Sequence, residues 1–425
     1  MRARFRIFYG VAAYLLVPVM CGVMLWRGGR ERGYWQNFSQ RFGFGGALDR
    51  ASVWVHAVSV GEVQAAAALV LDLCARYPQI PLVLTTATPG GAQRARALFP
   101  DAVEVRFVPF DLPGAARRFF DRVRPRLAVI FETELWPNLY HECQRRRVPL
   151  VLASARISPR SVRRYKRLLG LFEDTLSQGV LIAAQAEGDA ERFRAIGAPQ
   201  AATHVTGNLK FDFALPASVV ARGAQLRASH APRRPVWVAG STHAGEEEIL
   251  LDAQRRLARL HPAALLVLVP RHPPRFAEVA EWLTRQGIEF VKVSQNVPCH
   301  ADTSVLLVDA LGELLDFYAA GDVAFVGGSL VAVGGHNLLE PAALGLPILT
   351  GPYYFNSKEI AELLIARGAL TVVHDAAELG EQLGKWLSDP GERERVGQLA
   401  RACIEDNRGA LAKLLRLIDP LLKSS

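Results

Sequence analysis

The chain of 425 residues is half hydrophobic and 21% charged, which predicts two or three packed domains and argues against a disordered, collagen-like or low-complexity protein. Its formal net charge is +9, and only seven of its 50 basic residues are lysine; this arginine-rich excess favours an anionic partner such as nucleic acid, an anionic membrane surface or a phosphorylated substrate. Five scattered cysteines, none in a C-x-x-C pair, argue against a disulfide framework or a zinc ribbon and fit a reducing compartment.

The first expected element is an uncharged apolar segment over residues 7–26. About 20 apolar residues match the hydrocarbon core of a bilayer. Arginines flank both of its ends, so the positive-inside rule sets no orientation, and Pro18 allows a kinked helix that lies in the membrane interface. A cleavable signal peptide is the alternative, but no short apolar core ends in an A-x-A-like site. We therefore predict an uncleaved membrane anchor over residues 1–32, with the rest of the chain on the cytoplasmic side.

After residue 50, short β-branched segments alternate with longer stretches of helical apolar spacing, such as 62–77 and 187–196. Strands are expected at 52–56, 82–86, 103–108, 127–131, 150–153, 180–184 and 204–206. Strands that alternate with helices predict a parallel sheet with right-handed crossovers. The first α/β domain is therefore predicted over residues 33–215.

A polar stretch at 213–235 interrupts this pattern and is interpreted as a linker. Further strands are then expected at 236–239, 264–269, 290–293, 305–308, 323–326, 347–349 and 370–373. These predict a second Rossmann-like domain over residues 216–400. The final helical run, 392–418, is long enough to pack back across a domain boundary, and Gly409 is a candidate break in it. Residues 401–425 are therefore expected as a C-terminal helix that packs back on the first domain.

Ligands of such sheets bind beyond the carboxyl ends of the strands, so the loops there carry the candidate sites. Ser59 and Glu62 follow the first strand with the S-x-x-E spacing of a capping box. Glu62 is also a candidate general base, which requires a carboxylate that can face the substrate. The residues alone leave both interpretations open.

Glu132 and Glu134 follow the strand at 127–131. In an extended segment alternate residues share a face, so both carboxylates are expected on one wall of a site. The alternative is that one of them pairs with an arginine in a structural ion pair. Lys210, in a Gly-Asn turn near the end of this domain, is a candidate anion contact.

In the second domain, the segment from Gly240 to Glu246 opens a helix and predicts either an anion site or a plain N-cap. Arg271, after Pro270, leaves a strand end with its guanidinium available for phosphate, whereas His272 is interpreted as an ordinary hydrogen-bonding residue.

The densest signal lies in Gly327-Gly328-Ser329 and in the segment from Gly334 to Pro341. Paired glycines allow backbone N–H groups to approach a phosphate, and a helix expected near Asn337 adds its dipole. Glu340, one turn into that helix, is a candidate acceptor for ribose hydroxyls. The P-loop and G-x-G-x-x-G patterns are both missing, and no H-E-x-x-H or carboxylate cluster predicts a metal site.

Taken together, these segments resemble the 3-deoxy-D-manno-octulosonic acid (Kdo) transferases of Gram-negative lipopolysaccharide synthesis. The resemblance covers nearly the whole chain. Its most specific parts are the apolar N-terminus and the motifs H-A-V-S-V-G-E, F-E-T-E-L-W-P-N, T-G-N-L-K-F-D, S-T-H-A-G-E-E, P-R-H-P, F-V-G-G-S-L and G-G-H-N-L-L-E-P.

The resemblance implies a GT-B glycosyltransferase, with two Rossmann-like domains that face each other across a cleft and with no metal or other cofactor. It implies transfer of Kdo from CMP-Kdo to the 6′-hydroxyl of a lipid A precursor at the inner membrane. Glu62 would be the proton acceptor, and Glu132 and Lys210 would support the transition state. The implied CMP contacts are Pro270, Arg271, Leu311, Gly312, Glu313, Asn337, Leu338, Leu339 and Glu340.

Two other functions fit parts of the sequence. Another GT-B enzyme that uses a UDP-sugar, including the related 2-epimerases, would share the glycine-rich loop and Glu340. A membrane-associated nucleic-acid-binding protein would explain the charge and the anchor, but it predicts aromatic side chains among the basic residues, and the aromatic residues here lie mostly in apolar segments.

Overall fold

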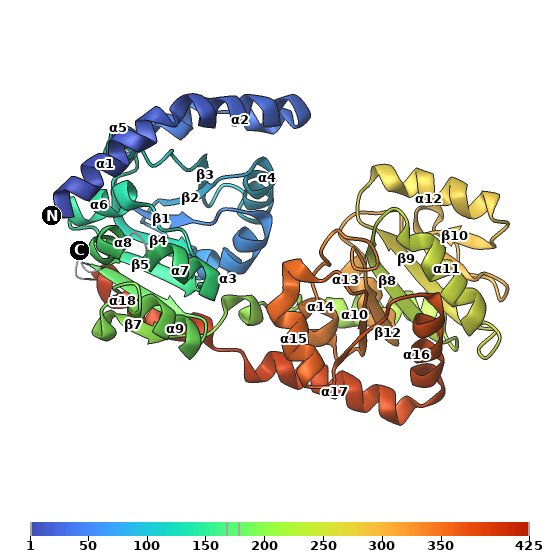
Figure 1. The fold of residues 1–425 in the computed structure, drawn as a ribbon. Helices are drawn as coiled ribbons and strands as arrows, with labels where there is room; N and C mark the ends of the chain where they lie inside the picture. Colours follow the sequence, from blue (N-terminus) through green and yellow to red (C-terminus); the bar gives the residue numbers. More distant parts are fainter. Residues whose placement is uncertain (1, 167–168, 177–178, 424–425) are drawn as a thin grey trace. The chain divides into compact units, whose positions relative to one another are not determined.

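The computed structural model describes residues 2–166, 169–176 and 179–423, and the chain divides into two compact units (Figure 1). The first unit consists of Met1–Phe213 and Asn407–Ser425, and the second of Ala214–Asp406. The boundaries predicted from the sequence, after residues 215 and 400, therefore shift to 213 and 406. The second shift arises because helix α17 (Pro390–Asp406) packs on helices of the second unit.

The first unit is built on a sheet of seven parallel strands in the order β3-β2-β1-β4-β5-β6-β7. The strands are β1 (Ser52–His56), β2 (Leu82–Thr86), β3 (Glu104–Phe107), β4 (Pro125–Phe131), β5 (Leu150–Ala155), β6 (Val180–Ala184) and β7 (Thr203–Val205). The crossovers include α3 (Val60–Arg76), α4 (Pro89–Leu98), α5 (Pro113–Val123), α6 (Pro137–Arg145), α7 (Pro159–Lys166), α8 (Leu169–Leu176) and α9 (Glu187–Arg194). The central strands are buried on both faces, which is why their sequences read as continuous apolar segments.

The second unit has a sheet of the same kind, in the order β10-β11-β9-β8-β12-β13-β14. Its strands are β8 (Val236–Thr242), β9 (Leu265–Pro270), β10 (Phe290–Lys292), β11 (Val305–Leu307), β12 (Val323–Val326), β13 (Ile348–Thr350) and β14 (Leu370–Val372). Its helices, besides α17, are α10 (Val219–His230), α11 (Glu246–Leu257), α12 (Pro274–Arg285), α13 (Leu314–Ala320), α14 (Leu339–Leu344), α15 (Lys358–Ala366) and α16 (Ala376–Ser388). The two-domain α/β architecture predicted from the sequence is confirmed.

The stretch 213–235, interpreted from the sequence as a linker, is folded for half of its length. Helix α10 lies in it and packs against α13 of the second unit. Gly223 permits this packing, because a Cβ atom there would lie 2.5 Å from the Cβ of Ala319. The linker prediction is therefore wrong over 219–230. Most side chains of this helix are exposed and polar or small, so its sequence resembles that of a loop.

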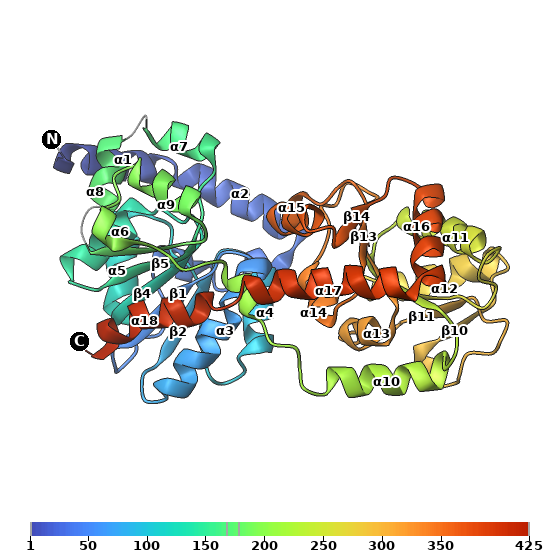
Figure 2. The ribbon, with the colours of Figure 1, turned by 90° about the horizontal axis from the view of Figure 1, so that it is seen from below.

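The C-terminal segment ends in α18 (Ala410–Lys423), which belongs to the first unit and lies beside β4 (Figure 2). The break from α17 comes at Gly409, whose φ of +97° suits glycine. Leu414, Leu415 and Ile418 of α18 are buried in the core that covers one face of the first sheet. The C-terminal helix is therefore an integral part of the first unit.

The N-terminus forms two helices, α1 (Arg2–Leu15) and α2 (Val17–Arg30). They meet at an angle of 44°, just before Pro18, which lacks an N–H and whose ring displaces the preceding turn. In the described part of the chain, no single helix has the length and apolar character needed to cross a bilayer. Only the bent pair of α1 and α2, taken together, is long and apolar enough.

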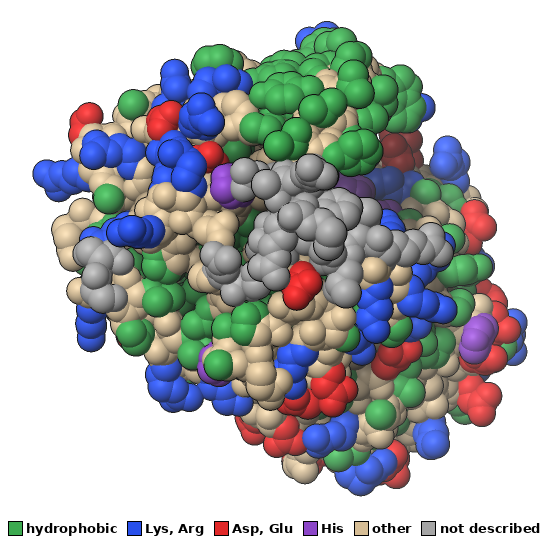
Figure 3. All heavy atoms as spheres, turned by 60° about the vertical axis from the view of Figure 1, so that its left-hand side comes forward, with side chains coloured by type: hydrophobic (Ala, Val, Ile, Leu, Met, Phe, Trp, Pro, Cys, Tyr) green, Lys and Arg blue, Asp and Glu red, His purple; other side chains and the backbone are tan. Residues whose placement is uncertain are grey.

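One side of α1 is fixed to the first unit. The Tyr9 hydroxyl donates to Asp111 (2.9 Å), and the Tyr14 hydroxyl accepts a hydrogen bond from the Gly114 N–H (3.1 Å). The other sides of α1 and α2 expose large hydrophobic side chains, among them Phe8, Leu15 and Trp26. Figure 3 shows a broad hydrophobic patch on the face of the molecule where these helices lie.

Candidate active site

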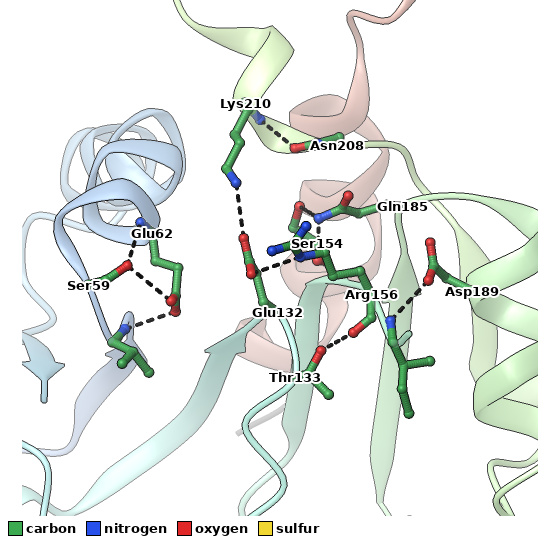
Figure 4. A network of polar contacts seen from close by, with 12 residues as sticks. Ser59, Glu62, Glu132, Thr133, Ser154, Arg156, Gln185, Asp189, Asn208 and Lys210 are labelled. Carbon is green, nitrogen blue, oxygen red and sulfur yellow. Dashed lines mark hydrogen bonds and ion pairs between the residues drawn. The ribbon is translucent and has the colours of Figure 1, made fainter. Parts of the chain in front are cut away.

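In the first unit the candidate residues gather at the carboxyl edge of the sheet, beyond the adjacent strands β1, β4 and β5. Glu62 lies in the first turn of α3, after β1. Glu132 directly follows β4, and Lys210 lies in the short 3₁₀-helix Leu209–Asp212 after β7. Figure 4 shows Glu62 on one side of this edge and the polar network around Glu132 on the other.

Glu62 forms only half of the capping box that its spacing predicts: Ser59 is the N-cap, but the Glu62 carboxylate accepts the backbone N–H of Val58 instead of that of Ser59. Its Oε2 accepts the Val58 N–H (2.9 Å), its Oε1 accepts the Ser59 hydroxyl (3.2 Å), and its own N–H faces the Ser59 Oγ at 3.5 Å. Each carboxylate oxygen has a second lone pair, and the side chain is half-buried. Burial is the main cause that raises the pKa of Glu62, and the charge of Glu132 adds to it, whereas Val58, Ser59 and Lys210 oppose the rise. The cap and a proton-accepting role are therefore compatible.

Glu132 is held between two cations. Its Oε1 lies 3.1 Å from the Lys210 Nζ, and its Oε2 lies 3.0 Å from the Arg156 Nε. Its φ of +57° is left-handed, an unfavourable backbone conformation for a residue other than glycine and one that clusters at functional sites. The chain turns here, so the expectation that Glu132 and Glu134 alternate along an extended segment is wrong. The predicted alternative, an ion pair with an arginine, is present.

Arg156 was not singled out from the sequence. It follows β5, and it fixes the turn after β4 twice: its guanidinium binds Glu132, and its carbonyl accepts the Thr133 hydroxyl. The strand end before it is also shaped by polar contacts, because the Gln185 amide donates to the Ser154 carbonyl (2.9 Å). A cation placed just after a central parallel strand was the signal that could have identified it.

Glu134 completes a group of three carboxylates. Burial raises its pKa to about 7, and the charges of Glu62 and Glu132 contribute to the rise. Three carboxyl groups beside the cations of Lys210 and Arg156 make a site that can accept a proton and hold an anion at one edge of the sheet.

In the second unit, the donor-site candidates lie at the carboxyl edge of the neighbouring strands β11, β9, β8 and β12. Pro270 ends β9, and the Arg271 N–H donates to the Thr242 carbonyl at the end of β8 (3.0 Å). Leu311, Gly312 and Glu313 form the loop after β11: Leu311 is exposed, Gly312 has a φ of +87°, and Glu313 is the N-cap of α13. The shared edge brings these loops to one end of the sheet.

The loop between β12 and α14 carries the remaining candidates. Asn337 precedes the helix, and its side chain caps it by accepting the Leu339 N–H (3.0 Å). Leu338 is the N-cap residue, and α14 itself starts at Leu339. Glu340 is therefore the second residue of a six-residue helix, rather than one turn into a helix that starts at Asn337.

The glycine-rich loop does not form the phosphate cradle expected from its sequence. Glu246, fully buried at the start of α11, accepts the backbone N–H groups of His243, Gly328, Ser329 and Leu330 at distances of 2.7–2.9 Å. The N–H groups of Gly334 and Gly335 donate to the Gly328 carbonyl. An internal carboxylate thus takes the place that the sequence assigned to phosphate.

Three histidines, His243, His272 and His336, lie near Arg271, and the first and the last were not singled out from the sequence. The Nε2 atoms of His243 and His336 are 2.8 Å apart, and their rings are nearly parallel, at 6°. His272 packs edge-on against His243. Within the ranges that the structure describes, no group of three or more His, Cys, Asp or Glu side chains has the arrangement of a metal site.

The chain is similar in sequence to known glycosyltransferases and in fold to a UDP-GlcNAc 2-epimerase. Residues 36–213 match the family described as 3-Deoxy-D-manno-octulosonic-acid transferase (kdotransferase), and residues 290–402 match the glycosyl transferases group 1. A UDP-GlcNAc 2-epimerase from Neisseria meningitidis, 12% identical, has a similar structure with a TM-score of 0.55 over 88% of this chain and 100% of that chain. This likeness shows the fold alone, the two-domain GT-B arrangement of parallel sheets.

Two curated relatives align over almost their full lengths. The 3-deoxy-D-manno-octulosonic acid transferase of Haemophilus influenzae is 40% identical and covers 98% of this chain and 99% of that protein. The enzyme of the same name from Bordetella pertussis is 38% identical and covers 97% of this chain and 99% of that protein. The resemblance seen in the sequence is therefore confirmed: the chain is a glycosyltransferase and belongs to the 3-deoxy-D-manno-octulosonic acid (Kdo) transferase family.

Proposed function

We propose that this Kdo transferase moves Kdo from CMP-Kdo to the 6′-hydroxyl of a lipid A precursor, with inversion and without a metal ion. The observation that carries the proposal is the half-buried Glu62 carboxylate of raised pKa, at a strand edge that also holds Glu132, Lys210 and Arg156. Family membership supports Kdo as the transferred group and sets aside the nucleic-acid-binding and UDP-sugar alternatives.

Glu62 accepts the proton of the acceptor hydroxyl while the oxygen of that hydroxyl attacks the anomeric carbon of Kdo. The bond from that carbon to the phosphate oxygen breaks at the same time, and its electron pair leaves with CMP. A single displacement of this kind inverts the anomeric configuration. General-base catalysis of this type contributes about 10²–10⁴-fold to the rate.

Charged side chains provide the electrostatic stabilisation that other nucleotide-sugar enzymes obtain from a divalent ion. In the first unit, Lys210 and Arg156 flank Glu132. Kdo is a sugar acid, and these two cations can balance the negative charge of its carboxylate. In the second unit, Arg271 holds the departing phosphate, because a guanidinium binds phosphate through charge-assisted hydrogen bonds. The loops that contain Gly312 and Asn337 complete the proposed CMP site, in which Glu340 accepts ribose hydroxyls.

We also propose that α1 and α2 anchor the enzyme at the inner membrane, with both units on the cytoplasmic side. Exposed apolar side chains on α1 and α2, and the flanking Arg27, Arg30 and Arg32, support this proposal. The tie between Tyr9 and Asp111 holds one side of α1 against protein, which favours helices that lie in the interface over helices surrounded by lipid.

The experiment that tests the reaction replaces Glu62 by Gln. Glutamine can keep the hydrogen bonds to Val58 and Ser59 at the start of the helix but cannot accept the proton, so the substitution separates the two roles of this residue. We expect kcat to fall by about 10²–10⁴-fold, while the affinity for CMP, held by the other unit, stays within about twofold. Product formation from CMP-Kdo and a tetra-acylated lipid A precursor is followed by mass spectrometry, with and without excess EDTA.

Glu191→Gln, at an exposed carboxylate on α9, is the matched control and should leave turnover unchanged. If Glu62→Gln kept turnover within a few fold of the wild type, Glu62 would be a helix cap only. Loss of activity in EDTA that magnesium restores would contradict the metal-free reaction.

A further inference from the structure

The histidine pair in the second unit joins two loops at the proposed CMP site. His243 follows β8, and His336 lies between β12 and α14. Their rings are nearly parallel, at 6°, with centroids 5.0 Å apart, and the two Nε2 atoms are at a hydrogen-bond distance of 2.8 Å. Both residues belong to glycine-containing segments in which the sequence analysis assigned phosphate binding to backbone N–H groups. The imidazoles therefore have no role in the mechanism described above.

The geometry limits how many protons this pair can hold. When both rings are neutral, one Nε2 carries the hydrogen and donates it to the lone pair of the other. One further proton can enter at the Nδ1 of the donating ring without disturbing that bond. A second proton would set two N–H groups face to face. The pair therefore accepts one proton, and after uptake both Nδ1 atoms carry hydrogen and can donate to an anion.

Burial and the positive charges around the pair keep it neutral when no anion is bound. Arg271 and His272 face it from the loop after β9, and burial together with Arg271 lowers the pKa of His336 to about 4. Burial is also the main cause that lowers the pKa of His243, with His272 and Arg271 adding to it.

Three charged groups on the neighbouring helices already have partners. Glu247 of α11 and Arg275 of α12 pair with each other at 2.8 Å. Glu246 of α11 receives four backbone N–H groups. Among the described residues, no carboxylate is shown in an ion pair with Arg271, so the local field is positive and opposes protonation. An arriving phosphodiester offsets the positive charge of Arg271 and favours protonation of the pair.

We propose that the His243–His336 pair takes up one proton when the phosphate of the donor binds beside Arg271. The resulting imidazolium binds the phosphodiester, and it offsets the second negative charge that the phosphate gains when the glycosidic C–O bond breaks and CMP leaves as a monoester. The proton comes from solvent on binding and returns to solvent after CMP dissociates. This inference rests on the proposed CMP-Kdo donor and makes the histidines direct ligands of its phosphate.

The test is calorimetry on the full chain at about pH 7, where unperturbed histidine is close to its pKa. The probe is the methyl ester of CMP, a phosphodiester like the donor, because CMP itself is a monoester that titrates near pH 6. Titrations in PIPES and in Tris, whose ionisation enthalpies differ, give the number of protons taken up on binding. We expect about one proton per chain, and tighter binding as the pH falls from about 8 to about 6.

His243→Gln/His336→Gln should abolish both the uptake and the pH dependence, and should weaken binding by about 10- to 100-fold, as expected for the loss of charge-assisted hydrogen bonds. Each single variant should reduce the uptake, which keeps the test decisive if the double variant does not fold. His374→Asn, at an exposed histidine paired with Glu378 in the same unit, is the control and should retain full uptake.

The outcomes separate the inference from the function on which it rests. Binding of the ester without a buffer-dependent enthalpy, or full uptake in both single variants, would overturn the histidine proposal and leave the CMP-Kdo donor in place. Failure of the wild-type chain to bind either the ester or CMP would contradict the donor itself.

Discussion

At the residue scale, Glu246 explains why a glycine-rich loop with the sequence of a phosphate site can have a structural role instead. Its carboxylate is fully buried, and four backbone N–H groups from two loops donate to it. Hydrogen bonds to an ionised acceptor contribute about 1.5–3 kcal/mol each, more than neutral ones. This residue therefore holds the loops that carry His243 and Gly328 in place at the proposed donor site.

Replacement of Glu246 by Gln should destabilise the second unit. The side-chain amide would turn an NH₂ group toward backbone donors and remove the charge that they solvate, so we expect a loss of about 2–4 kcal/mol in unfolding free energy. Urea denaturation followed by tryptophan fluorescence measures it. Glu248→Gln, two residues along the same helix and exposed, should change stability by less than about 0.5 kcal/mol. Equal midpoints for the two variants would show that Glu246 does not organise these loops.

The residues that could be predicted from the sequence were those whose partners are close in the chain. The N-cap contacts between Ser59 and Glu62 span three positions, and the structure contains them. Glu246 and Gly328 are 82 positions apart, and Glu132 and Arg156 are 24 positions apart. Spacing gives no information about such pairs, because the fold decides which donor meets which acceptor.

At the element scale, the positions of the strands followed from sequence more closely than those of the polar helices. A parallel strand buried on both faces needs a continuous apolar segment, and β1, β2, β6 and β12 have the predicted bounds. Helix α10 was assigned to a linker because only a narrow stripe of it, including Val219 and Gly223, is buried. Such a helix can be identified only from its packing against α13, because its own composition does not distinguish it from a loop.

Helix α18 depends on a cap from a distant residue. Asp212 Oδ1 accepts the Gly409 N–H and its Oδ2 accepts the Leu411 N–H, both at 2.6 Å. Asp212→Ala should therefore destabilise the first unit by about 1–2 kcal/mol, the usual contribution of an N-cap, and Asp212→Asn by less, since one acceptor oxygen remains. Hydrogen exchange of residues 410–423 should accelerate in the same order.

Asp406→Ala provides the comparison for this cap. Asp406 ends α17 and forms an exposed ion pair with Arg367 at 2.9 Å, which is worth no more than about 1 kcal/mol. Unchanged exchange of α18 in the Asp212→Ala variant would mean that burial of Leu414 and Ile418 alone fixes the helix.

At the scale of the whole molecule, each unit has its own sheet and its own core on each face. The chain passes between the units only after residues 213 and 406. The alternation of strands and helices predicted this division, and Gly409 was a candidate break before a C-terminal helix on the first domain. The sequence did not show, however, that α17 belongs to the second unit as far as Asp406. That assignment depends on which sheet each helix covers, and both helices have an amphipathic pattern.

The N-terminal helices are the part of the molecule whose surface is least suited to water. Phe8, Leu15 and Trp26 are 75%, 74% and 60% exposed, and single-chain soluble proteins rarely expose apolar patches of this extent. Arg27 and Arg30 in the last turn of α2, and Arg32 after it, add an attraction to anionic lipid of about 1 kcal/mol each near the surface. Binding of the whole enzyme to vesicles should therefore need both the apolar side chains and anionic headgroups.

The variant Phe8→Ser/Leu15→Ser/Trp26→Ser should lose flotation with vesicles of phosphatidylglycerol and phosphatidylethanolamine, while its affinity for CMP, held by the second unit, is unchanged. Its thermal stability should also hold, because these side chains are exposed. Leu260→Ser, at a residue 70% exposed in the second unit, removes the same kind of surface elsewhere and should float like the wild type. Wild-type binding should weaken in high salt, since the arginine contribution is screened within about 10 Å at 0.1 M. A triple variant that floated as well as the wild type would place the membrane contact on another surface.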